Sequence, residues 1–172
     1  MSNILDSLNA FMSQGGFLMY FIAALTLCMW VLVFERVLFF KGALKAGVQQ
    51  SLSVWEARTE RKSWNAQQIR NAMISRMNEK IDANMDMITA LVAMCPLMGL
   101  LGTVTGMIEV FSVLSLTGGG DAKSMAGGVS KATIPTMSGM VAAISGVFAN
   151  TYLQRIAGDE KSLFADHLTM DH

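Results

Sequence analysis

Residues 95–107 read Cys-Pro-Leu-Met-Gly-Leu-Leu-Gly-Thr-Val-Thr-Gly-Met, an apolar stretch in which glycine recurs at positions 99, 102 and 106. The stretch lies within a longer uncharged segment, because 22 residues without a charge separate Asp86 from Glu109. A helix needs roughly 20 residues to cross about 30 Å of bilayer hydrocarbon. The stretch therefore predicts a helix that crosses a membrane.

Two further uncharged gaps are long enough for the same purpose, with 28 residues between Asp6 and Glu35 and 23 between Lys131 and Arg155. The composition agrees, since 52% of the residues are hydrophobic and only 15% are charged. An average soluble domain has about 25% charged residues. We expect an all-α membrane protein whose three transmembrane helices occupy residues 17–40, 87–116 and 128–154.

Basic residues are concentrated in one part of the chain, because nine of the thirteen lie between Arg36 and Lys80. The positive-inside rule places such a segment in the cytoplasm. The N-terminus contains no Lys or Arg before the first helix and no evident cleavage site, so we expect this helix to stay in the mature protein. The expected segments are 1–16 outside, 41–86 in the cytoplasm, 117–127 outside and 155–172 inside.

The expected cytoplasmic segment is too polar to span a membrane, and amphipathic helices with a solvated charged surface are its natural structure. Asn65 followed by Gln68 resembles a capping box at the start of the second of these helices. Apolar residues then recur at helical spacing from Ile69 to Ile88, and neither Gly nor Pro intervenes before Pro96. We therefore expect one long helix to run from the cytoplasm into the membrane.

Two prolines fall inside the predicted transmembrane helices. A proline removes one backbone donor, and its ring crowds the carbonyl group four residues earlier. We therefore expect a kink or a helix start at Pro96 and at Pro135.

Small residues mark the faces on which the second and third helices pack. Helices in lipid associate through close backbone contact, which small side chains permit. Small residues occupy about half of the circumference of the third helix, so it packs on more than one side. One three-helix chain is too small to cover all these faces, which favours a homo-oligomer. The residues expected at helix contacts are Gly99, Gly102, Gly106, Gly139, Ala143 and Gly146.

Two threonines border these faces, Thr103 in the second helix and Thr136 in the third. Each hydroxyl could line a polar path, or could bond a carbonyl group in its own helix, as is common in membrane helices. The uncharged stretches around them contain no Asp, Glu, His or Lys. A hydroxyl cannot hold a proton near neutral pH. A proton path along these helices therefore needs a carboxylate from another chain.

The block at 95–107 resembles the MotA/TolQ/ExbB proton-channel family, the membrane subunits of proton-driven motors in bacterial inner membranes. Residues 128–150, with Thr136 and Gly139, are similar to the third-helix pattern of that family. Three helices and a short cytoplasmic segment resemble ExbB or TolQ, whereas MotA has a fourth helix and a larger cytoplasmic domain.

The resemblance implies a ring of five copies, with a pore lined by the second and third helices. Thr103 and Thr136 match the pore-facing threonines of the family. The pore would hold the membrane helices of an ExbD-like single-span partner that carries the proton-binding Asp. The work would then pass to a TonB-like chain. A TolQ-like subunit of the Tol-Pal system and a passive membrane scaffold are the alternatives.

The third helix departs from the family pattern at Ser130 and Lys131, where Ala and Glu are usual, and Glu109 stands where an uncharged polar residue is common. Glu109 lies six residues outward from Thr103, and Lys131 lies five residues outward from Thr136. At about 1.5 Å per residue the two charges are level on antiparallel helices. We expect an ion pair at the outer mouth, within or between subunits. The alternative is that each side chain reaches the outer interface separately.

Other classes of function are disfavoured. The formal net charge is +0, which lacks the basic excess of nucleic-acid binding proteins. The HExxH, GxSxG and Walker A patterns of enzymes are absent from the sequence. Cys28 and Cys95 lie in apolar runs, so we expect buried thiols, and His167 and His172 lie in a polar tail. No cofactor and no metal site is expected.

Overall fold

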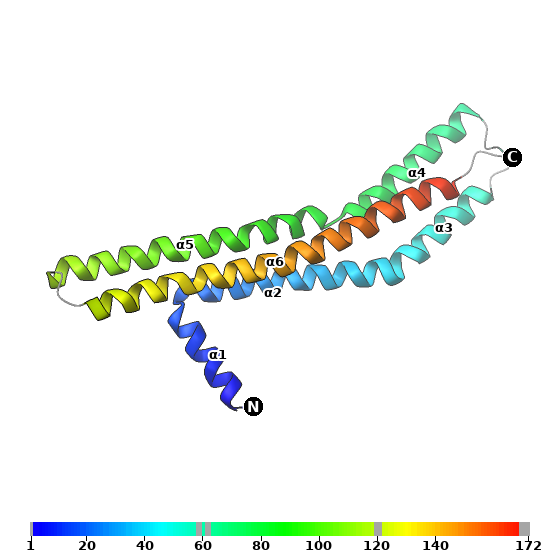
Figure 1. Ribbon diagram of the computed structural model, residues 1–172. Helices are drawn as coiled ribbons and strands as arrows, with labels where there is room; N and C mark the ends of the chain where they lie inside the picture. Colours follow the sequence, from blue (N-terminus) through cyan, green and yellow to red (C-terminus); the bar gives the residue numbers. More distant parts are fainter. Residues whose placement is uncertain (1, 58–59, 61–62, 119–121, 169–172) are drawn as a thin grey trace. The chain divides into compact units, whose positions relative to one another are not determined.

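The computed structural model describes residues 2–57, 60, 63–118 and 122–168, and the regular secondary structure of these residues is entirely helical (Figure 1). This confirms the predicted all-α class. The elements are α1 (Ser2–Gln14), α2 (Phe17–Leu38), the short π-helix η1 (Phe39–Ala43), α3 (Leu44–Glu56), α4 (Trp64–Asp82), α5 (Met85–Thr117) and α6 (Ala122–His167).

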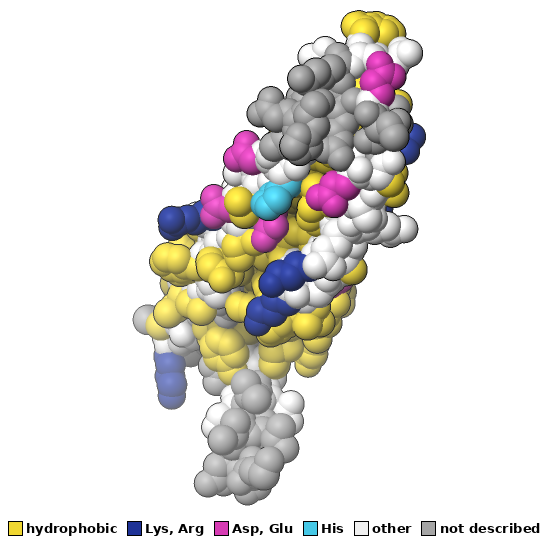
Figure 2. Space-filling view, turned by 90° about the vertical axis from the view of Figure 1, so that its right-hand side faces the viewer, with side chains coloured by type: hydrophobic (Ala, Val, Ile, Leu, Met, Phe, Trp, Pro, Cys, Tyr) yellow, Lys and Arg dark blue, Asp and Glu magenta, His cyan; other side chains and the backbone are white. Residues whose placement is uncertain are grey.

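Three helical runs among the described residues are long and apolar enough to cross a membrane, as the three uncharged gaps predicted. They are Phe17–Glu56, Trp64–Leu116 and Met125–His167. Large hydrophobic side chains are exposed on all three, and Figure 2 shows many of them on one face, with charged side chains of both signs between them. A contiguous exposed apolar surface of this kind indicates contact with lipid or with partner helices.

The chain divides into two compact units, and each is described by itself. The first unit comprises residues 1–30 and 89–147, which hold α1, the start of α2, most of α5 and the first part of α6. The second unit comprises residues 31–88 and 148–172, which hold the end of α2, η1, α3, α4, the start of α5 and the end of α6.

Helices α5 and α6 run antiparallel and side by side in the first unit (Figure 1). The small side chains of α6 point into the protein, since Gly139, Ala142, Ala143 and Gly146 are all buried. The large side chains on its other side, among them Met137, Met140 and Ile144, are exposed. Along α6 the small residues are thus buried and the large ones exposed, which is the arrangement that close helix packing needs.

The predicted outer segment 1–16 consists largely of α1. The chain turns at Gly15 and Gly16, and α2 begins at Phe17. Gly16 has a φ of +69°, in the left-handed region that glycine adopts without steric penalty. Gly15 and Gly16 of the turn line a cavity together with residues of α5 and α6, whereas α1 extends away from these helices (Figure 1).

The second unit has a core of larger side chains. Trp55 of α3, Ile81 of α4 and Phe164 of α6 are each at most 2% exposed. Arg70 of α4 donates hydrogen bonds from Nε to the Leu168 carbonyl (2.7 Å) and from Nη2 to the Ala165 carbonyl (2.9 Å). The last carbonyl groups of a helix lack intrahelical donors, so Arg70 satisfies two acceptors at the end of α6.

The start of α4 corrects the predicted capping box. The N-cap is Ser63, and its Oγ accepts a hydrogen bond from the Ala66 amide at 3.2 Å. The predicted cap, Asn65, lies two residues later, inside the helix. Ala66, whose amide makes this bond, is fully buried, so the first turn of the helix lies against the core of the unit.

We expect Ser63→Ala to lower the free energy of unfolding by about 1 kcal/mol, the usual effect of losing an N-cap hydroxyl. Thermal unfolding of the purified protein in detergent, followed by circular dichroism, measures this change. Ser53→Ala is the matched control, because the Ser53 hydroxyl donates to the Gln50 carbonyl in its own helix. Equal effects of the two substitutions would contradict the assigned cap.

The prediction of one long helix from Ile69 into the membrane is wrong. Helix α4 ends at Asp82 and α5 begins at Met85. Between them Ala83 has a ψ of 135° and Asn84 has a φ of 62°. Asparagine tolerates the left-handed region better than most residues. The Asn84 side chain also donates to Glu35 Oε2 at 3.4 Å, a contact that no local pattern contains.

Helix α6 is continuous from Ala122 to His167, so it includes the whole predicted span 128–154 and most of the predicted tail 155–172. Which of these residues lie in a membrane stays a prediction. The helix begins within the predicted outer turn 117–127, of which residues 119–121 lie outside the described part. The helix continues beyond 154 and through Gly158, so the end of the apolar stretch does not end it.

Both prolines lie inside helices, Pro96 in α5 and Pro135 in α6, so neither begins a helix. The cysteines differ from each other: Cys95 is buried, as expected, whereas Cys28 is exposed. The apolar run around Cys28 indicated burial, but a helix in a membrane protein presents apolar residues to lipid as well as to its core.

Candidate functional site

The candidate site is the interface between α5 and α6 in the first unit, where glycines bring the two backbones close together. A Cβ atom added to Gly99 would lie 2.9 Å from Thr136 Cα, and one added to Gly139 would lie 2.5 Å from the Cys95 carbonyl oxygen. Both distances are too short for real atoms, so a side chain at either position would force the helices apart. The close approach at these two glycines fixes how the other residues of α5 and α6 face each other.

The other residues predicted at helix contacts also face neighbours in this unit. Gly102 faces Pro135, and Gly106 faces Ala132. About two turns after Gly139 along α6, Gly146 faces Met29 of α2 and Val92 of α5. The structure thus shows these contacts within one chain.

Thr136 connects the two helices. Its Oγ1 donates a hydrogen bond to the Gly99 carbonyl of α5 at 2.8 Å, and the side chain is partly buried. The carbonyl in its own helix, which sequence reasoning considered as a partner, is not the acceptor. A glycine at position 99 makes this bond possible, because it lets Thr136 approach the α5 backbone.

Thr103 behaves differently. Its Oγ1 donates to the Leu100 carbonyl at 2.7 Å, three residues earlier in its own helix. Thr105 likewise donates to the Leu101 carbonyl at 3.0 Å and lies 3.1 Å from the Gly102 carbonyl. The two predicted pore threonines are therefore not hydrogen-bonded to each other. Each hydroxyl oxygen can still accept a hydrogen bond from another group.

The interface is free of charge over most of its length. Residues 87–108 of α5 and 132–154 of α6 contain no Asp, Glu, His, Lys or Arg. Hydroxyl and backbone groups can pass a hydrogen bond along, but they cannot store a proton near neutral pH. The chemistry available at this interface is therefore hydrogen bonding to a titratable group that comes from elsewhere.

Charges appear at the end of the interface. Lys131 Nζ lies 3.8 Å from Glu109 Oε1 within one chain, and both side chains are about half exposed or more, at 49% and 66%. The structure thus brings together the two charges that the helical spacing placed level with each other. That this pair stands at the outer mouth of a pore stays a prediction.

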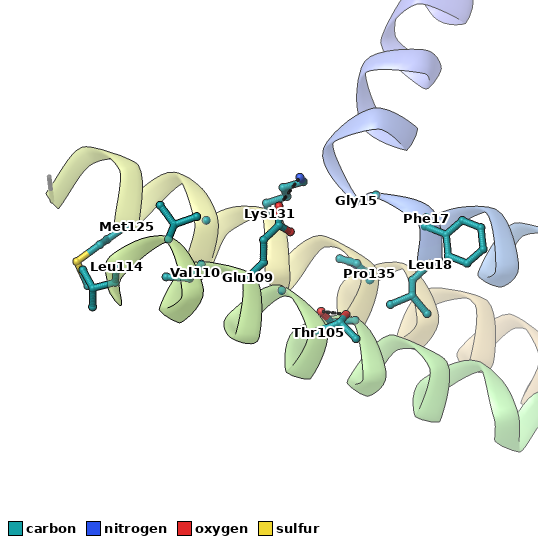
Figure 3. A pocket seen from close by; sticks show the side chains of 15 residues that line it. Gly15, Phe17, Leu18, Thr105, Glu109, Val110, Leu114, Met125, Lys131 and Pro135 are labelled. Atoms are coloured by element: carbon teal, nitrogen blue, oxygen red, sulfur yellow. Dashed lines mark hydrogen bonds and ion pairs between the residues drawn. The ribbon is translucent and has the colours of Figure 1, made fainter. Parts of the chain in front are cut away.

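The Glu109 and Lys131 side chains line a cavity of about 570 Å³ that sequence reasoning missed (Figure 3). Its walls come from the turn between α1 and α2, from α5 and from α6. Figure 3 shows Phe17 and Leu18 on one side of it and Val110 and Leu114 of α5 on another. The only sequence signal was the Gly15-Gly16 pair, which indicates a turn but not what the turn covers.

A second feature that sequence reasoning left without a role is Arg36, which is only 4% exposed in the second unit. Its Nη1 donates to the Lys80 carbonyl at 3.2 Å, and its Nε lies 3.2 Å from Glu35 Oε2. The guanidinium also stacks on Phe39, 4.9 Å from the ring centroid. An ionisable pair inside an apolar run was the signal, because such residues are rarely without a partner.

Metal binding finds no support in the part of the chain that the structure describes, where no three His, Cys, Asp or Glu side chains gather. Nδ1 of His167 lies 2.6 Å from the Leu163 carbonyl in its own helix. His172 lies outside the described residues.

Comparison with known proteins gives a family and several relatives. A model of the MotA/TolQ/ExbB proton channel family matches residues 38–165. The ExbB-like 1 protein of Synechocystis sp. is 37% identical over 82 residues, which are 46% of this chain and 32% of that protein. The biopolymer transport protein ExbB of Xanthomonas campestris pv. campestris is 31% identical over 83 residues, 48% of this chain and 33% of that protein.

The match to these relatives thus covers about a third of their length. No solved structure matches the chain.

Proposed function

The chain belongs to the MotA/TolQ/ExbB proton channel family, and we propose that it is an ExbB-like channel and stator subunit of a proton-driven motor. With an ExbD-like partner it uses the proton-motive force to energise TonB-dependent transport across the outer membrane. Each proton that crosses a potential of 100 mV supplies about 2.3 kcal/mol for this work. The chain contributes the path and the fixed frame, and the partner contributes the proton-binding Asp.

The observation that carries this proposal is that the uncharged stretches of α5 and α6 carry hydroxyl groups. Thr103 and Thr136 offer acceptor lone pairs in stretches that contain no titratable carboxylate. An Asp carried by a helix of another chain would find hydrogen-bond partners there, and no competing charge. This arrangement suits a proton path in which an Asp of the partner chain holds the proton and the threonine hydroxyls hydrogen-bond to that Asp.

The assembly is proposed to be a ring of five copies in the bacterial inner membrane, with the N-terminus outside and the C-terminus in the cytoplasm. Two features support it. The exposed apolar side chains of α5 and α6 require cover by lipid or by other helices. The concentration of basic residues between Arg36 and Lys80 favours a cytoplasmic position for that segment.

A passive scaffold is the competing function, and one observation favours it. Both threonine hydroxyls donate to backbone carbonyl groups, Thr136 across to Gly99 and Thr103 within its own helix. Hydroxyls used in this way can serve packing alone. The two functions differ in what removal of the hydroxyl does to transport when the assembly stays intact.

We expect the double substitution Thr103→Val, Thr136→Val to lower TonB-dependent uptake about tenfold. Each proton transfer would lose a hydrogen bond to the partner's Asp, and the loss of one such bond corresponds to a factor of about ten. The assay follows uptake of a siderophore complex in cells that depend on this chain. Copurification with the partner measures assembly and should stay unchanged. Serine at both positions keeps the hydroxyls and should restore uptake.

Thr133→Val is the matched control, because the Thr133 hydroxyl is exposed and donates to the Ser130 carbonyl in its own helix. Uptake at the wild-type rate in the double valine variant would remove the proton-path assignment. Parallel loss of uptake and of copurification would support the scaffold.

A further inference from the structure

The cavity bounded by the α1–α2 turn, α5 and α6 combines an apolar interior with one opposite-charge pair. Phe17, Leu18, Val110 and Leu114 supply apolar walls, and Glu109 and Lys131 lie beside them (Figure 3). Thr105 also lines the cavity, but its hydroxyl already donates to the Leu101 carbonyl. Polar recognition of a ligand here therefore depends on the carboxylate and the ammonium group.

The volume of the cavity limits what can occupy it. A helix with side chains is about 10 Å in diameter, so about 570 Å³ would hold only about 7 Å of it, or little more than one turn. A helix of a partner or of a second copy therefore does not fit this space as a docked element. A volume of this size is typical of sites for small amphiphilic molecules.

The depth of the two charges indicates where such a molecule comes from. Counted from the middle of the predicted span 87–116, Glu109 lies about 11 Å outward, and Lys131 lies about 15 Å outward from the middle of 128–154. Half of the hydrocarbon thickness is about 15 Å. Both charges therefore lie near the level where acyl chains meet head groups. This step rests on the proposed orientation of the chain in the membrane.

We propose that the cavity is a binding site for one zwitterionic phospholipid of the phosphatidylethanolamine class. Lys131 binds the lipid phosphate, Glu109 accepts hydrogen bonds from the lipid ammonium group, and part of one acyl chain occupies the space along Phe17, Val110 and Leu114, while the rest of the lipid lies outside the cavity. The Lys131 and Glu109 side chains are 49% and 66% exposed, so a head group can reach both charges. An anionic lipid without the ammonium group could still place its phosphate at Lys131, but it would leave Glu109 facing a negatively charged head group with no cation of the lipid to pair with.

The test uses the full chain purified in mild detergent, with native mass spectrometry after addition of phosphatidylethanolamine or phosphatidylglycerol of the same acyl chains. We expect the wild type to retain more phosphatidylethanolamine than phosphatidylglycerol. Glu109→Lys should reverse the preference toward phosphatidylglycerol, because the ammonium group of phosphatidylethanolamine then loses its acceptor and is repelled by the new lysine. Binding constants of phosphatidylethanolamine should weaken about tenfold or more in Lys131→Gln, through loss of a charge-assisted hydrogen bond.

Val113→Trp tests the apolar part of the site, because Val113 lines the cavity and the larger ring would fill it. Leu116→Trp is the matched control on the same helix, since Leu116 is 86% exposed and does not line the cavity. Lys161→Gln is the control for charge, because Lys161 pairs with Asp82 in the second unit. We expect lipid binding to fall in Val113→Trp and to stay unchanged in both controls.

Equal retention of the two lipids by the wild type, or an unchanged preference in Glu109→Lys, would overturn the head-group assignment. Retention of lipid in Val113→Trp at the wild-type level would overturn the cavity as the site. These measurements need no partner and no transport, so they can fail while the proposed motor function stands. Conversely, loss of the transport proposal through the threonine variants would leave lipid binding intact.

Discussion

Gly139→Val is expected to prevent α5 and α6 from packing, and to lower the stability of the protein by about 3 kcal/mol or more, the upper range for overpacking. A Cβ at this position would lie 2.5 Å from the Cys95 carbonyl oxygen and 3.2 Å from Gly99 Cα. Both are backbone atoms of the facing helix, so no side-chain rotation relieves the clash. The helices must separate, which also breaks the Thr136 bond to the Gly99 carbonyl.

Thermal unfolding in detergent measures this effect, with an expected drop of roughly 10 °C in the melting temperature. Gly127→Val is the matched control, because nothing lies within 4 Å of a Cβ added there. The same chemical change in open space should be neutral or slightly stabilising, since glycine is a poor helix former. A similar melting temperature for both variants would show that the close approach at Gly139 is not what holds the helices.

Arg36→Ala should destabilise the second unit by about 3 kcal/mol, because it removes a charged donor from the Lys80 carbonyl and leaves the space of a buried side chain empty. Lys80 lies two residues before the end of α4, where carbonyl groups have lost their helical donors. Glu35 would also lose its positive neighbour while still facing Asn84.

Hydrogen exchange followed by mass spectrometry locates this effect, and we expect faster exchange around residues 80–86. Arg36→Lys keeps the charge but lacks the planar group that reaches both the carbonyl and the Phe39 ring, so it should be intermediate. Arg76→Ala is the control, because Arg76 is an exposed basic residue on the same α4. Exchange that rises equally in Arg76→Ala would contradict a specific role for Arg36.

Sequence reasoning was most successful where the deciding property is carried by the residue itself. The uncharged gaps predicted three candidate spans, because hydrocarbon excludes charge and a span needs a set length of helix. The small face of α6 was predicted from residue size, and the burial of Gly139 and Gly146 agrees with it. The approach of Glu109 to Lys131 followed from counting helical rise outward from the two threonines.

Sequence reasoning failed where a contact from a distant part of the chain decides the local structure. No glycine or proline marks the break at Ala83 and Asn84, and Asn84 is held by Glu35, 49 residues earlier. Helix α4 begins at Trp64 with Ser63 rather than Asn65 as its cap, and its first turn is buried at Ala66. The acceptor of Thr136 lies 37 residues away, so spacing within its own helix could not identify it.

The amino-acid sequence by itself determined that this chain is helical, has three stretches able to cross a membrane, and has no charged group along residues 87–108. These are properties of composition and of short-range order, and each residue carries them wherever it lies. The tertiary structure alone decided which carbonyl each threonine binds, where α4 stops, and that a turn, α5 and α6 enclose a cavity beside an ion pair. These depend on atoms that only folding brings within a few ångströms of each other.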